Sequence, residues 1–379
     1  MAESSHCSPS SSDSEQGSSC LLGLLKPFNE DPRVSSRFAF PCKVGGRPAW
    51  LEAKNVPKRS DVLCGTCSQR LEFLLQIYAP LDSEIIGHDE AFHRMLYVFY
   101  CVNPACTKEK EYCSVLRSQL SAENPFYSID FESNLLLGLQ KGCGEAEINV
   151  CVVCCQAASS FCGKCRRRYY CSRECQVVDW RLGHRDICPS TDNCIYYYFP
   201  PFLLDISEEE PESVSHQSPS IEKTFSDDEE LEDIEKETTS TTTVTRDKIF
   251  ERFQLRTSQE PNQVLRYAPR GECLEPLWFR EEKRILDESS EVPPCPYCGE
   301  PRVFEFQVMP QLLYFLEEKV KQSSCGERTN DVKLRYMKNS IEFGTIVVYT
   351  CRKSCSLKKD EHFSFYAKEF VRVQDAFSY

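Results

Sequence analysis

Cysteine and histidine pairs are concentrated between residues 151 and 188. Each pair is spaced by two or three residues, which lets both members bind one zinc ion, at about 2.3 Å from sulfur and slightly less from nitrogen. Eight such ligands in so short a segment predict a finger folded around two metal ions. Cys155 remains an alternative ligand to Cys154. The pairs are Cys151 with Cys154, Cys162 with Cys165, Cys171 with Cys175, and His184 with Cys188.

Two further sets of cysteines offer the same chemistry over longer spacings. In each set a Cys-x-x-Cys pair is followed by a strand pattern, a proline-marked turn, and a β-branched and aromatic strand that leads to a second pair. Pairing of the two strands would gather four thiols, so each set predicts a zinc-ribbon-like Cys₄ site. Cys113 remains an alternative to Cys106. The sets are Cys64, Cys67, Cys101 and Cys106, and Cys295, Cys298, Cys351 and Cys355.

The repeated order of these two sets suggests an internal duplication. We expect an α+β fold in which two duplicated zinc-ribbon-like halves, residues 38–142 and 245–379, pack together as one composite β domain. The finger, residues 143–194, would be inserted between them. Residues 1–37 would be a disordered tail and residues 195–244 a disordered acidic linker.

Short helices should support these sites. The one inside the finger would carry Cys175, with Ser172 as its N-cap and Gly183 at its end. Outside the finger, apolar residues at helical spacing predict helices that cover the sheet. The predicted helices span residues 173–182, 249–253, 262–267 and 310–321.

Composition limits the classes of function. The chain has 24 cysteines and begins with a Ser- and Glu-rich stretch that does not resemble a signal peptide, so we expect a soluble protein in a reducing compartment, with metal sites in place of disulfides. No stretch is apolar enough for a membrane span. The formal net charge of −13 disfavours nucleic-acid binding, and much of the acidic excess lies between residues 205 and 237.

The segment from residue 151 to 188 resembles the MYND finger family at all eight metal positions and in its Tyr-Cys and Cys-Gln signatures. The resemblance implies interleaved pairs and supports docking of an acidic or proline-containing peptide. The segment has no His pair spaced as in a classical DNA-binding finger and no long basic helix, so we expect no sequence-specific DNA binding. The finger is also locally basic, which by itself indicates a solvated face. The implied ligand sets are Cys151, Cys154, Cys171 and Cys175 for one ion, and Cys162, Cys165, His184 and Cys188 for the other.

An enzyme is the main alternative class. MYND fingers occur inside SET-domain methyltransferases, but these need an Asn-His dipeptide, and none of the six histidines here follows an Asn. His93 and Cys101 could form a nucleophilic pair. Cys101 is better explained as a metal ligand, however, so we expect no catalytic activity.

The segments outside the finger resemble the programmed cell death protein 2 family. The resemblance implies a chaperone that binds a newly made small-subunit ribosomal protein of the uS-five family and supports small-subunit biogenesis in the cytoplasm and nucleus. A basic client could add to a free strand edge of the composite domain. The alternative is a transcriptional co-regulator that docks peptide motifs at the finger. The matching segments are residues 43–51, 74–80, 91–94, 264–267 and 305–313.

Overall fold

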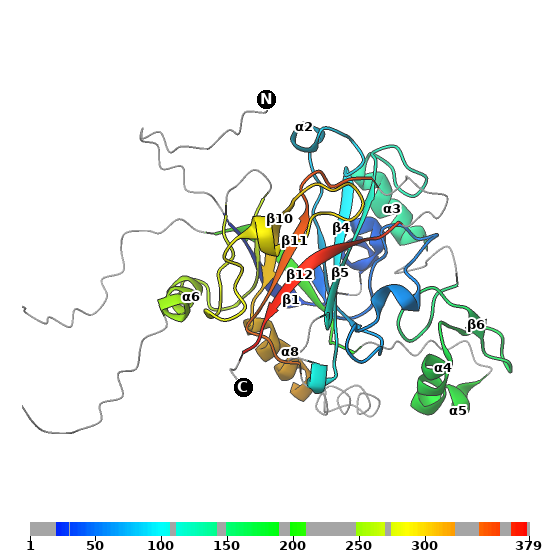
Figure 1. Cartoon of the computed structure of the whole chain (residues 1–379). Helices are drawn as coiled ribbons and strands as arrows, with labels where there is room; N and C mark the ends of the chain where they lie inside the picture. The colour runs from blue at the N-terminus through cyan, green and yellow to red at the C-terminus, as the bar shows by residue number, and fades with distance from the viewer. Residues whose placement is uncertain are drawn as a thin grey trace, which may run out of the picture.

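The computed structural model describes residues 20–29, 31–106, 111–141, 149–188, 198–209, 248–269, 274–322, 341–356 and 365–376 (Figure 1). Most of the acidic segment predicted to be a linker lies outside these residues. Among the described helices none is long and apolar enough to cross a membrane.

A closed antiparallel barrel forms the body of the described chain. Around the barrel the strands follow the order β1-β8-β2-β3-β4-β5-β12-β11-β10-β9, and β9 pairs with β1 to close it. The strands are β1 (Leu21–Pro27), β2 (Lys43–Val44), β3 (Glu72–Tyr78), β4 (His93–Tyr100), β5 (Cys113–Leu120), β8 (Phe202–Glu208), β9 (Gln263–Tyr267), β10 (Arg302–Val308), β11 (Thr345–Cys351) and β12 (Ala367–Gln374).

The pairing places two four-stranded meanders, β2 to β5 and β9 to β12, side by side. They meet on one side where β5 pairs with β12. On the other side β1 and β8 pair with each other and fill the gap, β8 pairing with β2 of the first meander and β1 with β9 of the second. Because every pairing is antiparallel, β4 and β11 run in opposite directions. The cysteines that follow β4 and end β11 therefore lie at opposite ends of the barrel.

Two predicted disordered segments contribute strands, which corrects the predicted boundaries. β1 lies within the predicted tail, and β8 lies within the predicted linker. Both lack strict alternation, and prolines precede β8, so the sequence pattern alone did not mark them. Their presence closes the barrel, and the expected free strand edge is absent from the described sheet.

Helices flank the barrel. The predicted helices near residues 249 and 310 are confirmed as α6 and α8, and Leu312 and Leu316 of α8 are buried. The helix predicted for residues 262–267 is wrong, since these residues form β9 and bury every side chain of that strand. The helices outside the finger are α1 (Pro32–Ser35), η1 (Arg37–Ala39), η2 (Arg59–Val62), α2 (Ser83–Ile86), η3 (Pro104–Cys106), α3 (Phe131–Lys141), α6 (Lys248–Ser258), α7 (Glu288–Glu291) and α8 (Gln311–Gln322).

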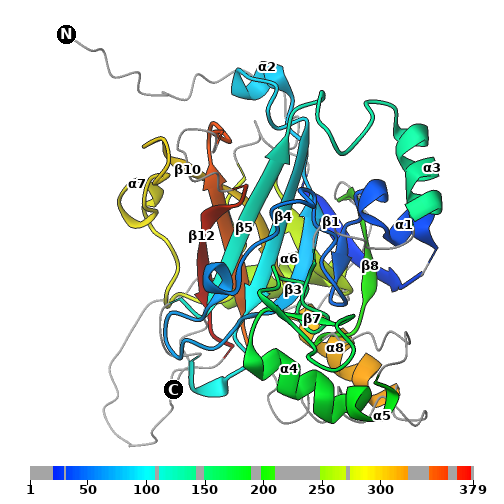
Figure 2. The same ribbon diagram turned by 90° about the vertical axis from the view of Figure 1, so that its right-hand side faces the viewer.

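The finger lies at one end of the barrel, opposite α2 (Figures 1 and 2). Its helix begins as predicted, because the Ser172 side chain accepts a hydrogen bond from the Cys175 backbone N–H. Val178 and Leu182 pack on the finger core, and Gly183 adopts a φ of 126° where the helix is interrupted. The finger elements are β6 (Ser160–Phe161), β7 (Tyr169–Tyr170), α4 (Arg173–Asp179), the π-helical turn η4 (Trp180–His184) and α5 (Arg185–Ile187).

Candidate metal centres

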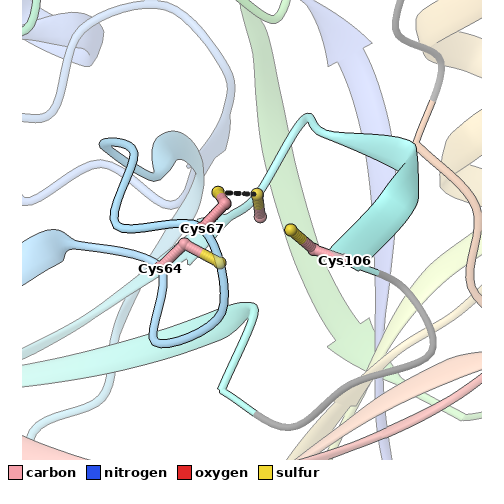
Figure 3. Close-up of side chains that lie close together, drawn as sticks. Cys64, Cys67 and Cys106 are labelled. Carbon is pink, nitrogen blue, oxygen red and sulfur yellow. Dashed lines mark hydrogen bonds between the residues drawn. The ribbon is translucent and has the colours of Figure 1, made fainter.

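The first cysteine set gathers at the end of the barrel nearest the finger. Cys64 and Cys67 come from the turn before β3, Cys101 follows β4, and Cys106 lies in η3. The Sγ atoms of Cys67 and Cys101 are 3.8 Å apart, and the labelled side chains converge on one point (Figure 3). Cys106 completes this group. Its alternative Cys113 begins β5 and is buried in the hydrophobic core.

The C-terminal set gathers at the opposite end of the barrel. Cys295 and Cys298 precede β10, and Cys351 and Cys355 come from the end of β11 and the turn after it. The Sγ distances are 3.7 Å between Cys295 and Cys355 and 3.5 Å between Cys298 and Cys351. The four predicted ligands therefore form a compact group.

The finger brings its ligands together in two interleaved groups, as the family resemblance implies. In the first group the Sγ of Cys171 lies 3.4 Å from that of Cys154 and 3.6 Å from that of Cys175. In the second, Nε2 of His184 lies 3.4 Å from Cys162 Sγ and 3.6 Å from Cys165 Sγ. The groups are Cys151, Cys154, Cys171 and Cys175, and Cys162, Cys165, His184 and Cys188.

The four Cys-x-x-Cys turns share one backbone conformation. The residue after each second cysteine has a positive φ, and its N–H donates to the carbonyl of the first cysteine at 2.8–2.9 Å. These residues are Ser68, Cys155, Arg166 and Gly299. Cys155 occupies this left-handed position, so it takes no part in the thiol group and Cys154 provides the ligand. The shared turn explains why the Cys-x-x-Cys spacing indicates which thiols lie close together.

The spacing of the ligand atoms fits tetrahedral zinc. With metal–sulfur bonds of about 2.3 Å, a regular tetrahedron places sulfurs about 3.8 Å apart, and a nitrogen ligand slightly closer. The distances of 3.4–3.8 Å agree with this. Hydrogen bonds within each thiol group lower the pKa of some members and raise the pKa of others, such as Cys171 and Cys355. A hydrogen bond from Cys355 lowers the pKa of the Cys351 thiol to about 4, and hydrogen bonds from Cys154, Cys171 and Cys175 hold the pKa of Cys151 well below its ordinary value.

Charged side chains from the barrel support the C-terminal group. Arg117 of β5 donates to the carbonyl of Cys355 at 3.2 Å and to Glu369 at 2.6 Å. The other oxygen of Glu369 accepts from Arg302 at 3.1 Å and from the backbone N–H of Cys351 at 3.2 Å. A strand of the first meander thus positions the metal-binding turn of the second.

The first finger group is likewise built against the barrel. Arg70 Nη1 lies 3.8 Å from the Sγ of Cys175, and Arg47 donates to the Sγ of Cys155 at 2.8 Å. Trp50 donates to the Cys155 carbonyl at 2.7 Å. A Cys₄ site with a divalent ion would carry two excess negative charges, which these partly buried guanidinium groups would offset. No spacing rule marked Arg47, Arg70 or Arg117, because each acts on a distant part of the chain.

The basic residues of the finger divide into two kinds. Arg168 is buried and pairs with Asp179 at 2.6 Å, and Tyr170 donates to the other oxygen of Asp179. Arg168 therefore stabilises the finger core. The remaining basic residues are exposed, as expected for a solvated face: Lys164, Arg166, Arg167, Arg173, Arg181 and Arg185.

The alternative Cys/His pair is separated in the fold. His93 begins β4, whereas Cys101 follows its far end and belongs to a thiol group. Burial lowers the pKa of His93 to about 4, and its Nδ1 lies 2.9 Å from the Tyr78 hydroxyl. His93 is thus a buried, neutral side chain, and it lies at the opposite end of β4 from Cys101 and its thiol group.

The fold and these groups define a metal-binding zinc-finger protein with a protein-interaction role. The MYND finger model matches residues 151–188, and MYND fingers mediate protein–protein interactions. Models of the Programmed cell death protein 2 N-terminal domain and C-terminal putative domain match residues 19–134 and 247–375. The N-terminal match begins just before β1, in agreement with the corrected boundary of the tail.

The chain belongs to the Programmed cell death protein 2 family. It is 37% identical over 352 residues to Programmed cell death protein 2 of Mus musculus, with 89% of this chain and 91% of the relative covered. It is 24% identical over 411 residues to Probable 20S rRNA accumulation protein 4 of Schizosaccharomyces pombe, covering 92% of this chain and 95% of the relative. No solved structure matches the chain.

Proposed function

We propose that this protein is a non-enzymatic chaperone for a newly made basic protein of the small ribosomal subunit, of the uS-five family, and acts in the cytoplasm and nucleus. The observation that carries the proposal is full-length similarity to a relative named for 20S rRNA accumulation. The net charge of −13 supports it, because an acidic partner attracts and screens a basic client before ribosomal RNA replaces it.

The metal groups have a structural role in this proposal. Each holds one zinc ion with four protein ligands, a closed set that leaves no position for substrate. The two meanders with their Cys₄ groups descend from one duplicated zinc-ribbon-like unit. In support, both contain a Cys-x-x-Cys turn before the second strand and a bulge in the following pairing, near Phe73 and near Phe304.

Co-expression of the client tests this function. The client should remain soluble with the full chain and with a variant in which residues 149–188 are replaced by a flexible linker. It should precipitate with Cys295→Ser/Cys298→Ser, because loss of the C-terminal site disorders the barrel. A client that stays insoluble with the full chain would contradict the proposal. Loss of solubility with the finger replacement alone would move the client site to the finger.

A second function, peptide docking by a transcriptional co-regulator, is favoured by one observation. Val177 and Trp180 are each 37% exposed on neighbouring turns of the finger helix, surrounded by exposed basic residues. Exposed Trp is typical of binding hot spots. Affinity capture from cytosol and nuclear extract with wild type and Trp180→Ala distinguishes the two functions. Capture of the ribosomal client by both proteins would support the chaperone function. Capture of co-regulator complexes by wild type, and their loss with Trp180→Ala, would support peptide docking.

A further inference from the structure

A cavity of about 310 Å³ lies beside the C-terminal end of β5 and close to the C-terminal metal group. Its walls come from segments that are distant in sequence: residues 52–55, the turn after β5, Ser356 beside the C-terminal metal group, and Phe365. Leu120, Pro125, Phe126 and Phe365 supply apolar surface. The volume is at the lower limit for small-ligand pockets, so it suits one or two side chains of a polypeptide.

Two of the loops that border this cavity carry only negative charge, whereas residues 52–55 contribute the cation Lys54. Residues 79–92, between β3 and β4, contain four carboxylates and no Lys or Arg, and residues 121–132 contain three carboxylates and no Lys or Arg. Glu90 and Glu123 line the cavity itself. The others add to the negative potential around it. The seven carboxylates are Asp82, Glu84, Asp89, Glu90, Glu123, Asp130 and Glu132.

The cavity wall already accepts a cation. Nζ of Lys54 lies 5.3 Å from the centroid of the Phe126 ring, within the range of a cation–π contact. Long cationic side chains bury their methylene stems against apolar surface and keep the charged group in a polar setting. Apolar walls below a carboxylate rim match both parts of such a side chain.

We infer that this cavity binds Arg or Lys side chains of an extended basic segment of the partner protein. The identity of the partner rests on the proposed function, whereas the chemistry of recognition rests on the cavity. The finger contacts Trp50 and Pro57, which flank one wall of the cavity, but none of its own residues lines the cavity. The cavity also replaces the strand edge that the closed barrel does not offer.

The test compares full-length variants with two probes, the purified uS-five-family ribosomal protein and a hexa-arginine peptide. Glu90→Lys/Glu123→Lys reverses the lining charge, and Glu90→Gln/Glu123→Gln removes it with little change of shape. Glu275→Lys/Glu317→Lys makes the same change of net charge at exposed sites that do not line the cavity. Metal content and thermal midpoint are measured for each variant to confirm folding.

We expect the lining lysine variant to bind both probes about tenfold more weakly or worse, the glutamine variant to be intermediate, and the distant variant to stay within about twofold of wild type. Equal weakening by the distant variant would show a general charge effect and overturn the inference. Unchanged binding of the ribosomal protein to the lining variants would also overturn it, while leaving the proposed function intact. Wild type that binds hexa-arginine through the cavity but does not bind the ribosomal protein would contradict the proposed function alone. Wild type that binds neither probe would overturn both.

Discussion

A buried ion pair links the two meanders in addition to their strand pairing. Arg94 of β4 and Glu305 of β10 form a bidentate ion pair, with N–O distances of 2.5 and 2.8 Å. Neither side chain has exposed surface. Arg94 also donates to the Ala79 carbonyl, and Tyr267 donates to Glu305. The pair therefore joins strands of the first and second meanders through the barrel interior.

Breaking this pair should be costly, because it leaves a buried charge without its partner. We expect Arg94→Met to lower the free energy of unfolding by about 3–5 kcal/mol. The double variant Arg94→Met/Glu305→Met should lose much less than the sum of the two single changes. Urea unfolding of the four proteins measures the coupling. Additive losses would show that the two residues stabilise the barrel independently.

The buried His93 should make stability depend on pH. Its pKa of about 4 in the folded protein lies below the ordinary value of about 6.5, so the unfolded chain takes up a proton that the folded chain does not. The resulting loss of stability begins near pH 6.5, grows as the pH falls, and is complete below about pH 4, at up to about 3 kcal/mol.

His93→Phe should flatten this dependence, since Phe keeps the stacking on Phe40 but does not titrate. Unfolding is measured between pH 7 and the lowest pH at which the metal content is constant. A slope equal to that of wild type over this interval would show that other groups cause the pH dependence.

At the scale of elements, a side chain outside the finger supports one of the finger's metal sites: Arg70 Nη1 lies 3.8 Å from the Sγ of Cys175. The pKa of Arg70 is raised well above its ordinary value: burial opposes this, but the attraction of Glu72, Cys154 and Cys175 outweighs it. Arg59 also reaches the finger, but at 3.4 Å from Glu174, whose side chain is 72% exposed. Arg59 and Arg70 both lie between β2 and β3, but the Arg59 side chain is 28% exposed and that of Arg70 is 9% exposed. Arg59 therefore serves as the control for a substitution of Arg70.

Arg70→Gln should release one finger metal ion to a chelator about tenfold faster than wild type, because a hydrogen bond to a charged group contributes about 1.5–3 kcal/mol. Arg59→Gln should have a small effect, as expected for an exposed pair. Chelator-competition kinetics with a colorimetric zinc indicator measure both. Similar rates for the two variants would show that the barrel does not stabilise the finger site.

Local patterns predicted the metal groups well and the closure of the barrel poorly. The Cys-x-x-Cys spacing encodes a turn of a few residues, so each ligand pair was evident from the sequence. α6 and α8 were evident because apolar residues recur at helical spacing within each segment. β1, β8 and β9 are stabilised by strands far away in the chain, and Asn262 to Tyr267 after a proline resembled a helix start. Arg70 and Arg117 contact sites on other segments, which no local pattern could reveal.

At the scale of the whole molecule, the insertion between the two halves is shorter than the sequence indicated. β8 lies between β1 and β2 in the barrel, so a deletion of residues 143–243 would remove a barrel strand along with the finger. We expect that deletion to be insoluble. Replacement of residues 149–188 alone should leave a folded, metal-containing barrel. Circular dichroism and metal content of the two proteins check this, and a stably folded longer deletion would contradict the barrel as described.

The most direct test of the whole account is the metal content of the purified full-length chain. Among the described residues four groups of ligands each supply four atoms, so elemental analysis should return about four zinc ions per chain. Stepwise chelation should unfold the finger and then the barrel, because binding of structural zinc contributes on the order of 10–16 kcal/mol in small fingers. Two or fewer zinc ions per folded chain would contradict the assignment of the two barrel sites.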